Sequence, residues 1–309
     1  MGHGATLFRI DMAMTEPAPP RPQRLRHFTP LRYPGGKARL AAFVKVLLKS
    51  NSLLDGEYVE PYAGGAAIAI ELLLHEYVSR IHINDVSRPI HAFWSSVLNH
   101  TDDLARKILD TKLTVVQWDK QKAVLTAPDD YDDLTLGFAT FFLNRTNRSG
   151  ILNGGIIGGR DQTGPWKIDA RFNARELVTR ITAIARMRSR ISLTRRDALT
   201  FLTAGTRRWP SSTLVYLDPP YYVKGSQLYY DFYKPDDHAR VAKVLMKNGL
   251  EQQWMVSYDN VPEIRKLYTG ARHVIYDIDY SAHSARKGSE VMFFREGLKV
   301  PPLLGKVKG

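Results

Sequence analysis

The sequence predicts an open α/β sheet that is interrupted by a mostly helical insert. Three observations lead to this fold class: a strand–turn–helix–strand unit over residues 58–85, helical periodicity over residues 90–190, and a return of short apolar strands after residue 191. Strands that alternate with helices form largely parallel sheets covered by helices. The 309 residues are enough for one large domain or two modest ones.

The first thirty residues differ from the rest of the chain. Proline and arginine are dense between residues 15 and 30. Because proline fixes φ and removes the backbone donor, this density disfavours both helix and sheet. We therefore predict a flexible, basic, Pro-rich arm over residues 1–30.

Hydrophobic spacing predicts the remaining elements in chain order. Apolar residues three and four apart predict helices, and short apolar runs between polar turns predict strands. The last two strands follow each other across a polar loop, which indicates a closing hairpin. The expected helices cover residues 38–48, 66–77, 93–98, 104–112, 134–143 and 174–188, and the expected strands cover residues 58–60, 81–83, 192–194, 214–217, 253–257, 273–278 and 291–294.

Composition excludes several classes of protein. Lys and Arg number 44 against 31 Asp and Glu, and the net charge of +13 favours a polyanionic partner. The absence of Cys excludes disulfides, Cys-based zinc sites and a thiol nucleophile. No apolar run approaches the roughly 18 residues of a membrane span, so we expect no membrane partner and a cytoplasmic location. The histidines lack metal-ligand spacing, and no metal site is predicted.

The strongest candidate site directly follows the predicted strand 214–217 and consists of Asp218, Pro219, Pro220 and Tyr221. In open α/β sheets, ligands bind beyond the carboxyl ends of the strands. The two prolines make a rigid turn without amide donors, so its carbonyl oxygens point outward as acceptors. A carboxylate, a carbonyl and an aromatic ring together form a receptor for a planar amine. The alternative is a plain strand-to-turn corner whose Tyr packs locally.

A second candidate is the glycine turn after the first predicted strand, with Asp85 at the end of the next strand. Glycines let the backbone approach a ligand, and an acidic residue in this place suits ribose hydroxyls. The acidic start of the turn would repel phosphate, so an adenosine without pyrophosphate fits better than a dinucleotide. The alternative is that the glycines merely close the turn. The turn consists of Glu60, Pro61, Tyr62, Ala63, Gly64 and Gly65.

The insert, expected over residues 91–190, is basic. Between residues 143 and 196 Arg predominates over Lys, as expected where a planar fork binds phosphates or guanine edges. The alternative is a solvated basic helix face. Short polar donors beside arginines suit contacts with nucleic acid, and the candidates are Asn144, Arg145, Thr146, Arg148 and Ser149.

These motifs together resemble the Dam-type DNA adenine methyltransferases, which use S-adenosylmethionine. The resemblance runs from residue 31 to about residue 296. It implies a Rossmann-like S-adenosylmethionine-dependent methyltransferase sheet, built from residues 31–90 and 191–300, with an inserted, mostly helical target-recognition subdomain over residues 91–190. The motifs stand in the family's order: Tyr-Pro-Gly-Gly-Lys at 33–37, Glu-Pro-Tyr-Ala-Gly-Gly at 60–65, Asn-Asp at 84–85, Phe-Leu-Asn-Arg-Thr at 142–146 and Asp-Pro-Pro-Tyr at 218–221.

The resemblance implies site-specific methylation of N6 of a flipped adenine in double-stranded DNA. It implies a solitary enzyme or the partner of a cognate restriction endonuclease, encoded by a bacterium or a phage. Asp218 and the Pro219 carbonyl would accept the amine, and Tyr221 would stack on the base. Tyr33 stands where the best-known members carry an indole, and its ring still offers a cation–π contact to the sulfonium. The implied cofactor residues are Tyr33, Lys37, Glu60, Pro61, Ala63, Gly64, Asp85, Asp197 and Asp218.

Other functions use related sites. Methylation of cytosine N4 or of adenine in RNA needs the same acceptors and ring, although Asp before Pro-Pro-Tyr favours adenine in the family pattern. Methylation of a protein glutamine amide uses a similar motif that is usually led by Asn, and it would not need the basic insert. A non-catalytic DNA-binding protein on this fold is the alternative from another class.

Overall fold

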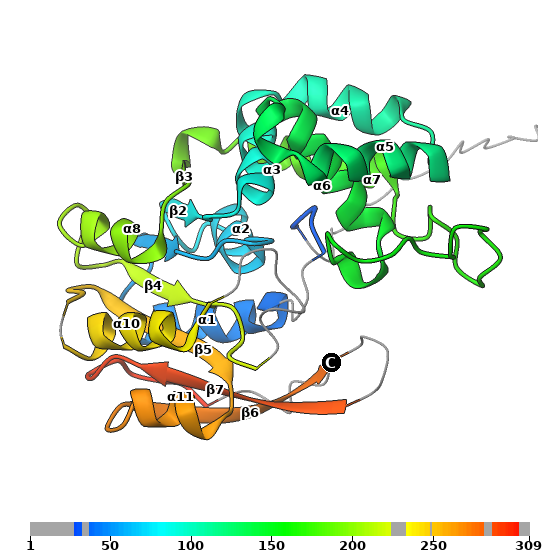
Figure 1. Cartoon of the computed structure of the whole chain (residues 1–309). Coiled ribbons are helices and arrows are strands. Elements are labelled where there is room, and N and C mark those ends of the chain that lie inside the picture. The colour runs from blue at the N-terminus through cyan, green and yellow to red at the C-terminus, as the bar shows by residue number, and fades with distance from the viewer. Residues whose placement is uncertain (1–27, 33–36, 224–232, 248, 281–285, 303–309) are drawn as a thin grey trace, which may run out of the picture.

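Seven strands form one sheet in the computed structural model, which describes residues 28–32, 37–223, 233–247, 249–280 and 286–302. The strand order is β3-β2-β1-β4-β5-β7-β6, running in Figure 1 from the helical block at the top to the opposite edge. Strands β1 to β5 are parallel, and β7 runs antiparallel between β5 and β6. The strands are β1 (Glu57–Glu60), β2 (Arg80–Asn84), β3 (Ile191–Thr194), β4 (Leu214–Leu217), β5 (Gln253–Asp259), β6 (Arg272–Tyr280) and β7 (Arg286–Phe294).

The helices fall into two groups. One group connects the strands of the sheet: η1 (Lys37–Leu40), α1 (Ala41–Ser50), α2 (Ala67–Leu74), α8 (Ala198–Gly205), α10 (Pro235–Met246) and α11 (Pro262–Leu267). The other lies between β2 and β3 and forms the block at the top of Figure 1: α3 (Arg88–Asn99), α4 (Thr101–Asp110), α5 (Val115–Thr126), η2 (Pro128–Asp130), α6 (Asp133–Thr146), η3 (Arg148–Gly150), α7 (Ala174–Ala185) and η4 (Arg188–Arg190). The predicted open α/β sheet with inserted helices and a closing hairpin is confirmed.

The sheet is buried on both faces. Successive side chains of a strand point to opposite sides of the sheet, and here they enter two different core clusters. In β1, Tyr58 belongs to the core cluster that includes α1 and α2, whereas Val59 belongs to the cluster that includes α8, α10 and α11. In β4, Tyr216 and Leu217 divide in the same way. Continuous apolar runs such as that of β4 are typical of central strands buried on both faces.

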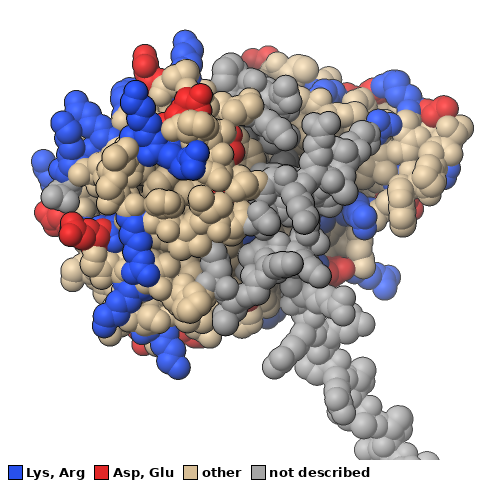
Figure 2. All heavy atoms as spheres, turned by 90° about the horizontal axis from the view of Figure 1, so that it is seen from below, with Lys and Arg blue, Asp and Glu red and all other residues tan. Residues whose placement is uncertain are grey.

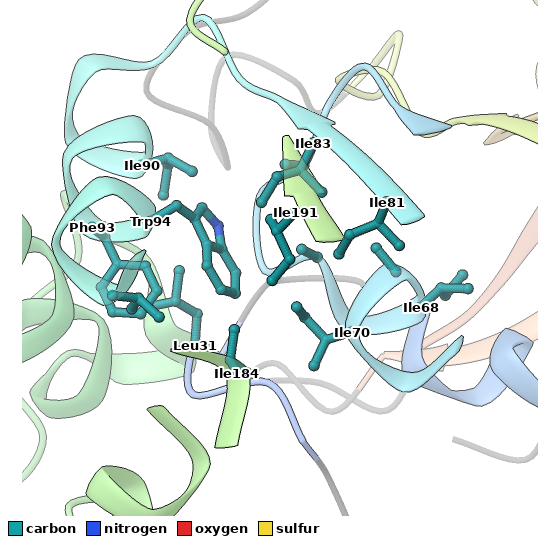
Figure 3. Packing of buried hydrophobic residues seen from close by; sticks show 14 of the residues in the cluster. Leu31, Ile68, Ile70, Ile81, Ile83, Ile90, Phe93, Trp94, Ile184 and Ile191 are labelled. Carbon is teal, nitrogen blue, oxygen red and sulfur yellow. The ribbon is translucent and has the colours of Figure 1, made fainter. Parts of the chain in front are cut away.

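The helical block shares its core with the sheet. Trp94 of α3 and Ile184 of α7 lie in one cluster with Ile81 and Ile83 of β2 and Ile191 of β3, and Figure 3 shows these side chains facing each other. Burying a large apolar side chain contributes about 1.5–3 kcal/mol. The insert is therefore fixed to the sheet by a continuous apolar interior.

The helix boundaries differ from the prediction in several places. The second predicted helix ends at Leu74 rather than at residue 77, and the last helix of the insert ends at Ala185 rather than at residue 188. Among the described residues, four α-helices were not predicted: α5, α8, α10 and α11. Helix α5 begins with two β-branched valines, and its buried side chains are only Trp118, Gln121, Val124 and Leu125, so its apolar stripe is short.

The end of the predicted arm is not a free segment. Within the described residues 28–32, the Thr29 hydroxyl donates to the Gly65 carbonyl at 2.5 Å, and the Pro30 carbonyl accepts from Arg145 Nε at 2.7 Å. These contacts join the segment to the glycine turn and to α6. The prediction of a flexible arm is therefore wrong for residues 28–30, and residues 1–27 lie outside the described part of the chain.

Basic side chains also gather outside the insert. Seen from below, in Figure 2, Lys and Arg are concentrated on the left side, where Figure 1 draws α10 and α11. Helix α11 alone contributes Arg265 and Lys266. In the part of the chain that the structure describes, no helix is long and apolar enough to cross a membrane.

Candidate active site

Three acidic residues are placed by the carboxyl ends of the parallel strands. Glu60 ends β1, Asp85 follows β2 and Asp218 follows β4. A fourth acid, Glu290, lies in the antiparallel strand β7. It stands opposite Asp259, the last residue of β5. Because β7 is antiparallel to β5, Glu290 in the middle of β7 lies at the edge where the parallel strands end. This edge is the expected place for a ligand in an open α/β sheet.

Asp218 is held through one of its two carboxylate oxygens. Its Oδ1 accepts from the Ser257 hydroxyl at 2.8 Å and lies 3.5 Å from Lys37 Nζ. The Ser257 hydroxyl is in turn within 2.8 Å of Tyr216 Oη. Within the described residues Oδ2 has no hydrogen-bond partner, and the Asp218 side chain is 26% exposed. One oxygen thus fixes the carboxylate, while the side chain as a whole stays partly accessible.

Glu290 occupies the interior side of the same cluster. Its carboxylate accepts from Lys37 Nζ at 2.5 Å, from Tyr221 Oη at 2.7 Å and from Tyr276 Oη at 2.6 Å. Lys37 therefore lies between two carboxylates, those of Glu290 and Asp218, and also 5.4 Å from the centre of the Tyr221 ring. This arrangement joins η1, the Asp-Pro-Pro-Tyr turn, β6 and β7.

The cluster holds more acidic than basic groups. Burial raises the pKa of the Asp218 carboxyl, Lys37 and Ser257 lower it, and the Glu290 carboxylate raises it again. The Asp218 charge in turn adds to the rise of the Glu60 pKa, which burial mainly causes. An electronegative, partly dry site of this kind favours a cation or a neutral amine over an anion.

The glycine turn is fixed from three sides. Gly64 adopts a φ of 45°, a conformation that side-chain-bearing residues seldom take. Its amide donates to Asp85 Oδ2 at 2.8 Å, and its carbonyl accepts from Trp94 Nε1 at 2.9 Å. The neighbouring Gly65 carbonyl accepts from Thr29. The turn and Asp85, both predicted to contact the cofactor, are thus joined by a direct hydrogen bond.

Asp85 and Asn84 brace the same edge. Asp85 Oδ1 accepts from the Ser87 amide at 3.0 Å, and Asn84 Nδ2 donates to the Pro61 carbonyl at 3.0 Å, while the Ala63 amide donates to the Asn84 carbonyl at 2.9 Å. These bonds fix the Asp85 carboxylate between the glycine turn and the start of α3.

Glu60 acts inside the protein. Its carboxylate is buried and accepts from the Ala69 amide at 3.1 Å, which supplies an acceptor to the first turn of α2. The residue before this helix, Ala66, has no side-chain cap. Burial raises the Glu60 pKa to about 8. Its predicted contact with the cofactor is thus accompanied by a structural role at the start of α2.

Glu60→Gln is expected to flatten the pH dependence of stability. The Glu60 pKa of about 8 in the fold compares with 4.5 for a free side chain. The folded state therefore binds the extra proton between these values, and wild-type stability falls as pH rises through that range. The loss, on the order of a few kcal/mol, should disappear in the glutamine variant, which keeps the acceptor for Ala69.

Chemical unfolding from about pH 5 to pH 9 measures this effect. Glu71→Gln is the matched control, because the Glu71 carboxylate is 22% exposed and pairs with Lys45 on the neighbouring helix. The control should follow the wild-type curve. Parallel curves for wild type and Glu60→Gln would contradict the buried, protonated state of Glu60.

Asp197, predicted to contact the cofactor, follows β3 at the same edge of the sheet, next to Arg196, whose carbonyl accepts from Asn84. Asp197 caps α8, where its Oδ1 accepts from the Leu199 and Thr200 amides at 3.1 Å each. It lines a shallow surface pocket of about 650 Å³ together with Arg207, Arg208 and other residues. Tyr33 falls among residues 33–36, outside the described residues.

Three of the five predicted DNA contacts are buried. Asn144 Oδ1 accepts from the Arg32 amide at 2.7 Å and Asn144 Nδ2 donates to the Arg32 carbonyl at 2.6 Å. Arg145 is buried, holds Pro30, and has its pKa lowered to about 9 by burial. Thr146 is fully buried and bonds back to Phe142. Burial contradicts a direct DNA contact by these three side chains. Asn144 and Arg145 instead fasten Arg32 and Pro30 to α6.

The two remaining candidates lie at the surface. Arg148 is exposed and Ser149 is half-buried, just after α6. The chain turns sharply here, and Gly150 has a φ of +75°. A Cβ at Gly150 would lie 2.5 Å from the Arg32 carbonyl oxygen, so the close approach of residues 28–32 requires glycine at this position.

Several site residues were missed by sequence reasoning. Ser257 and Tyr276 lie within strands and carry no motif of their own. Glu290 had a usable signal, since it is a single acid directly before the apolar run Val-Met-Phe-Phe. A buried charge is costly unless it has partners, and such a residue therefore points to a polar cluster.

The family model for D12 class N6 adenine-specific DNA methyltransferases matches residues 33–281. No curated protein matches the chain.

Solved structures show limited similarity. A conserved hypothetical protein of Streptococcus pyogenes is 14% identical, with 79% of this chain and 88% of that chain covered at a TM-score of 0.32. The rRNA methyltransferase AviRa from Streptomyces viridochromogenes is 13% identical, with 85% and 86% covered at a TM-score of 0.35. A SAM-dependent methyltransferase from Agrobacterium tumefaciens is 8% identical, with 84% and 61% covered at a TM-score of 0.40.

Proposed function

The chain belongs to the D12 class N6 adenine-specific DNA methyltransferase family, and from this premise we propose that Asp218 is the acceptor for the target amine. As a member of the family, the protein transfers the methyl group of S-adenosylmethionine to N6 of adenine in DNA. The observation that carries the proposal is the geometry of Asp218, which follows β4, has its Oδ1 held by Ser257 and keeps its side chain 26% exposed.

The chemistry requires acceptors rather than a strong base. The lone pair of an adenine amino group is delocalised into the ring, so the nitrogen is a poor nucleophile. Asp218 and the Pro219 carbonyl would accept its two N–H groups, which favours a pyramidal nitrogen whose lone pair is directed at the methyl group. Pro219 and Pro220 carry no amide donor that could compete for these acceptors. Positioning and preorganised acceptors then stabilise the developing positive charge.

Tyr221 supplies the stacking surface in this proposal. An adenine inside a duplex is inaccessible, so the base must be flipped out before reaction. Tyr221 is 3% exposed, and its hydroxyl is fixed by Glu290. We infer that entry of the base uncovers the ring, while the hydroxyl keeps the ring's orientation.

The residues of the glycine turn fit the cofactor. S-adenosylmethionine supplies an electrophilic methyl group on a sulfonium. The excess of carboxylates around Lys37 suits that cation, and the fixed backbone of Pro61, Ala63 and Gly64 offers a close approach without side chains in the way. Asp85 would accept from the ribose hydroxyls beside its bonds to the protein. Tyr33 and Lys37 would lie at the methionine end, as the motif at residues 33–37 predicts.

The helices α3 to α7 and the loop after α6 would recognise DNA. With Asn144, Arg145 and Thr146 in the interior, the accessible candidates are Arg148, Ser149 and the exposed residues of the loop between η3 and α7, residues 151–173. Among these are Trp166, which is 64% exposed, and Arg171, whose guanidinium lies 5.7 Å from the Trp166 ring centre. An exposed aromatic ring beside a cation suits contacts with nucleic acid.

Arg148→Ala is expected to weaken DNA binding and to reduce the slope of log K against log salt concentration by about 0.9, because one phosphate contact is lost. Fluorescence anisotropy at several salt concentrations measures the slope. Arg265→Ala, on the basic face at α11, is the matched control. A slope reduced by Arg265→Ala and unchanged by Arg148→Ala would place DNA on that other face and contradict the proposal.

Transfer of labelled methyl groups to mixed-sequence duplex DNA, followed by nucleoside analysis, tests the function. Label in N6-methyladenine is the expected result, whereas label in N4-methylcytosine or in RNA would support the alternatives, and cofactor binding without any transfer would support a non-catalytic role. The family match does not favour these alternatives. A cognate restriction endonuclease stays a prediction.

A further inference from the structure

Glu290 is an acid in an otherwise apolar part of the sheet. Its side chain is fully buried, and Val291, Met292 and Phe293 follow it in β7. It pairs with Asp259 of β5 on one side and with Tyr276 of β6 on the other. Burying an ionised carboxylate is costly unless several donors compensate, so its partners explain why the fold accepts it.

Three donors from three separate segments converge on this carboxylate. Tyr221 Oη bonds to Oε1, and Tyr276 Oη and Lys37 Nζ both bond to Oε2. Hydrogen bonds to a charged acceptor are about twice as strong as neutral ones. Glu290 therefore fixes both the ring of the Asp-Pro-Pro-Tyr motif and the ammonium group beside Asp218.

Lys37 lies closer to one of its two carboxylate neighbours than to the other. Its Nζ lies 2.5 Å from Glu290 but 3.5 Å from Asp218. If the ammonium group moved fully to Asp218, it would occupy acceptor capacity that the adenine amine needs. Glu290 holds the ammonium group on the buried side of the cluster, and Asp218 therefore stays available to the adenine amine.

We propose that Glu290 is a positioning residue for methyl transfer, which holds Lys37 away from Asp218 and orients the Tyr221 ring. The proposal rests on the proposed role of Asp218 as the amine acceptor. It assigns a task to a residue outside the recognised motifs, carried by hydrogen bonds that also anchor the hairpin of β6 and β7.

The charge environment gives the proposal a measurable signature. The groups that act on Asp218 are Lys37 and Ser257, which lower its pKa, and Glu290 together with burial, which raise it. The negative charge of Asp218 in turn raises the pKa of four neighbouring groups, which are Glu60, Tyr58, Tyr216 and Tyr276. Removing the Glu290 charge removes a repulsion and releases Lys37 toward Asp218. Both changes lower the Asp218 pKa.

The decisive variant is Glu290→Gln, which preserves side-chain shape and an acceptor for one donor. We expect kcat to fall about 10- to 100-fold, as for a displacement of about 1 Å in a catalytic group, with little change in DNA affinity. The low-pH limb of kcat, where activity is lost as Asp218 becomes protonated, should move to lower pH. Tyr276→Phe keeps the charge of Glu290 and should leave this limb in place.

A second readout does not depend on activity. The Asp218 pKa can be followed by ¹³C NMR of labelled aspartate carboxyls in the absence of cofactor and DNA, with the resonance assigned by its loss in Asp218→Asn. It should titrate lower in Glu290→Gln than in wild type. Glu71→Gln, which removes another Lys–Glu pair, should change neither kcat nor this titration.

The outcomes separate the two proposals. An unchanged Asp218 titration in a folded Glu290→Gln protein overturns the role of Glu290, even if kcat falls. A lowered Asp218 pKa with wild-type kcat also overturns it, because the ammonium shift would then have no effect on the reaction. A lowered pKa in a protein whose wild type methylates no nucleic acid would support the electrostatic positioning and refute the proposed function.

Discussion

Asp218→Ala is expected to lower kcat by about 10²–10³-fold while DNA affinity changes little. The substitution removes the carboxylate that stabilises positive charge on the attacking nitrogen, and loss of one such preorganised group costs about this much in other enzymes. It leaves the basic surface of the insert untouched. Single-turnover transfer of labelled methyl groups measures kcat, and anisotropy measures DNA affinity.

Asp218→Asn is the informative companion. Asparagine keeps one carbonyl acceptor but loses the charge, so its rate should fall between those of wild type and Asp218→Ala. A thermal unfolding curve shows that each variant is folded. Near-wild-type turnover in Asp218→Ala would refute the assignment of Asp218 as the acceptor.

Trp94→Ala should lower the free energy of unfolding by about 3–5 kcal/mol, the usual cost of truncating a large buried aromatic side chain. Trp94 is fully buried between the insert and the sheet. Trp94→Phe keeps most of the packing but leaves the Gly64 carbonyl without its donor, at a cost of about 1–3 kcal/mol. We expect it also to raise the Kd for S-adenosylmethionine, since Gly64 belongs to the turn that would bind it.

Trp118→Phe is the matched control for the indole hydrogen bond. Trp118 is also buried, and its Nε1 donates to Asn147 Oδ1 at 2.7 Å within the insert. Its replacement should cost comparable stability, measured by chemical unfolding, and leave the Kd for the cofactor unchanged. Equal effects of the two Phe variants on that Kd would mean that the glycine turn does not depend on Trp94.

The sheet was predictable because each strand is marked by a short apolar run and a polar end. The run at β4, for example, was placed with its observed bounds, Leu214–Leu217. Helix α10 carries Pro235 at its first position and two aspartates in its first turn, so its signal was present but was not used. Helix α5 has a narrow apolar stripe. It is stabilised by packing on α6, and a contact between two helices cannot be read from a local sequence pattern.

The site was predictable where a motif coincided with a strand end, as at Asp218 and Asp85. Glu290 escaped because its role depends on the reversed direction of β7 and on partners 253 and 69 residues away along the chain. Arg145 was misjudged for a related reason. Composition suggests that an arginine among polar residues is exposed, yet the carbonyl of Pro30, 115 residues away, holds it in the interior.

The common interior of insert and sheet bears on attempts to change target specificity by grafting. Exchanging residues 91–190 for the equivalent piece of a relative would cut through α3 and would separate Trp94 from the Gly64 carbonyl that it supports. Chimeras should instead join at surface positions beyond the shared packing, for instance within the loop between α6 and α7. The exposed middle of that loop, residues 157–167, could be replaced as a cassette while the hydrogen bond between Trp94 and Gly64 is kept, because Ile156, Ile168 and Phe172 on either side of it belong to the same buried cluster as Ile184 and Ile191.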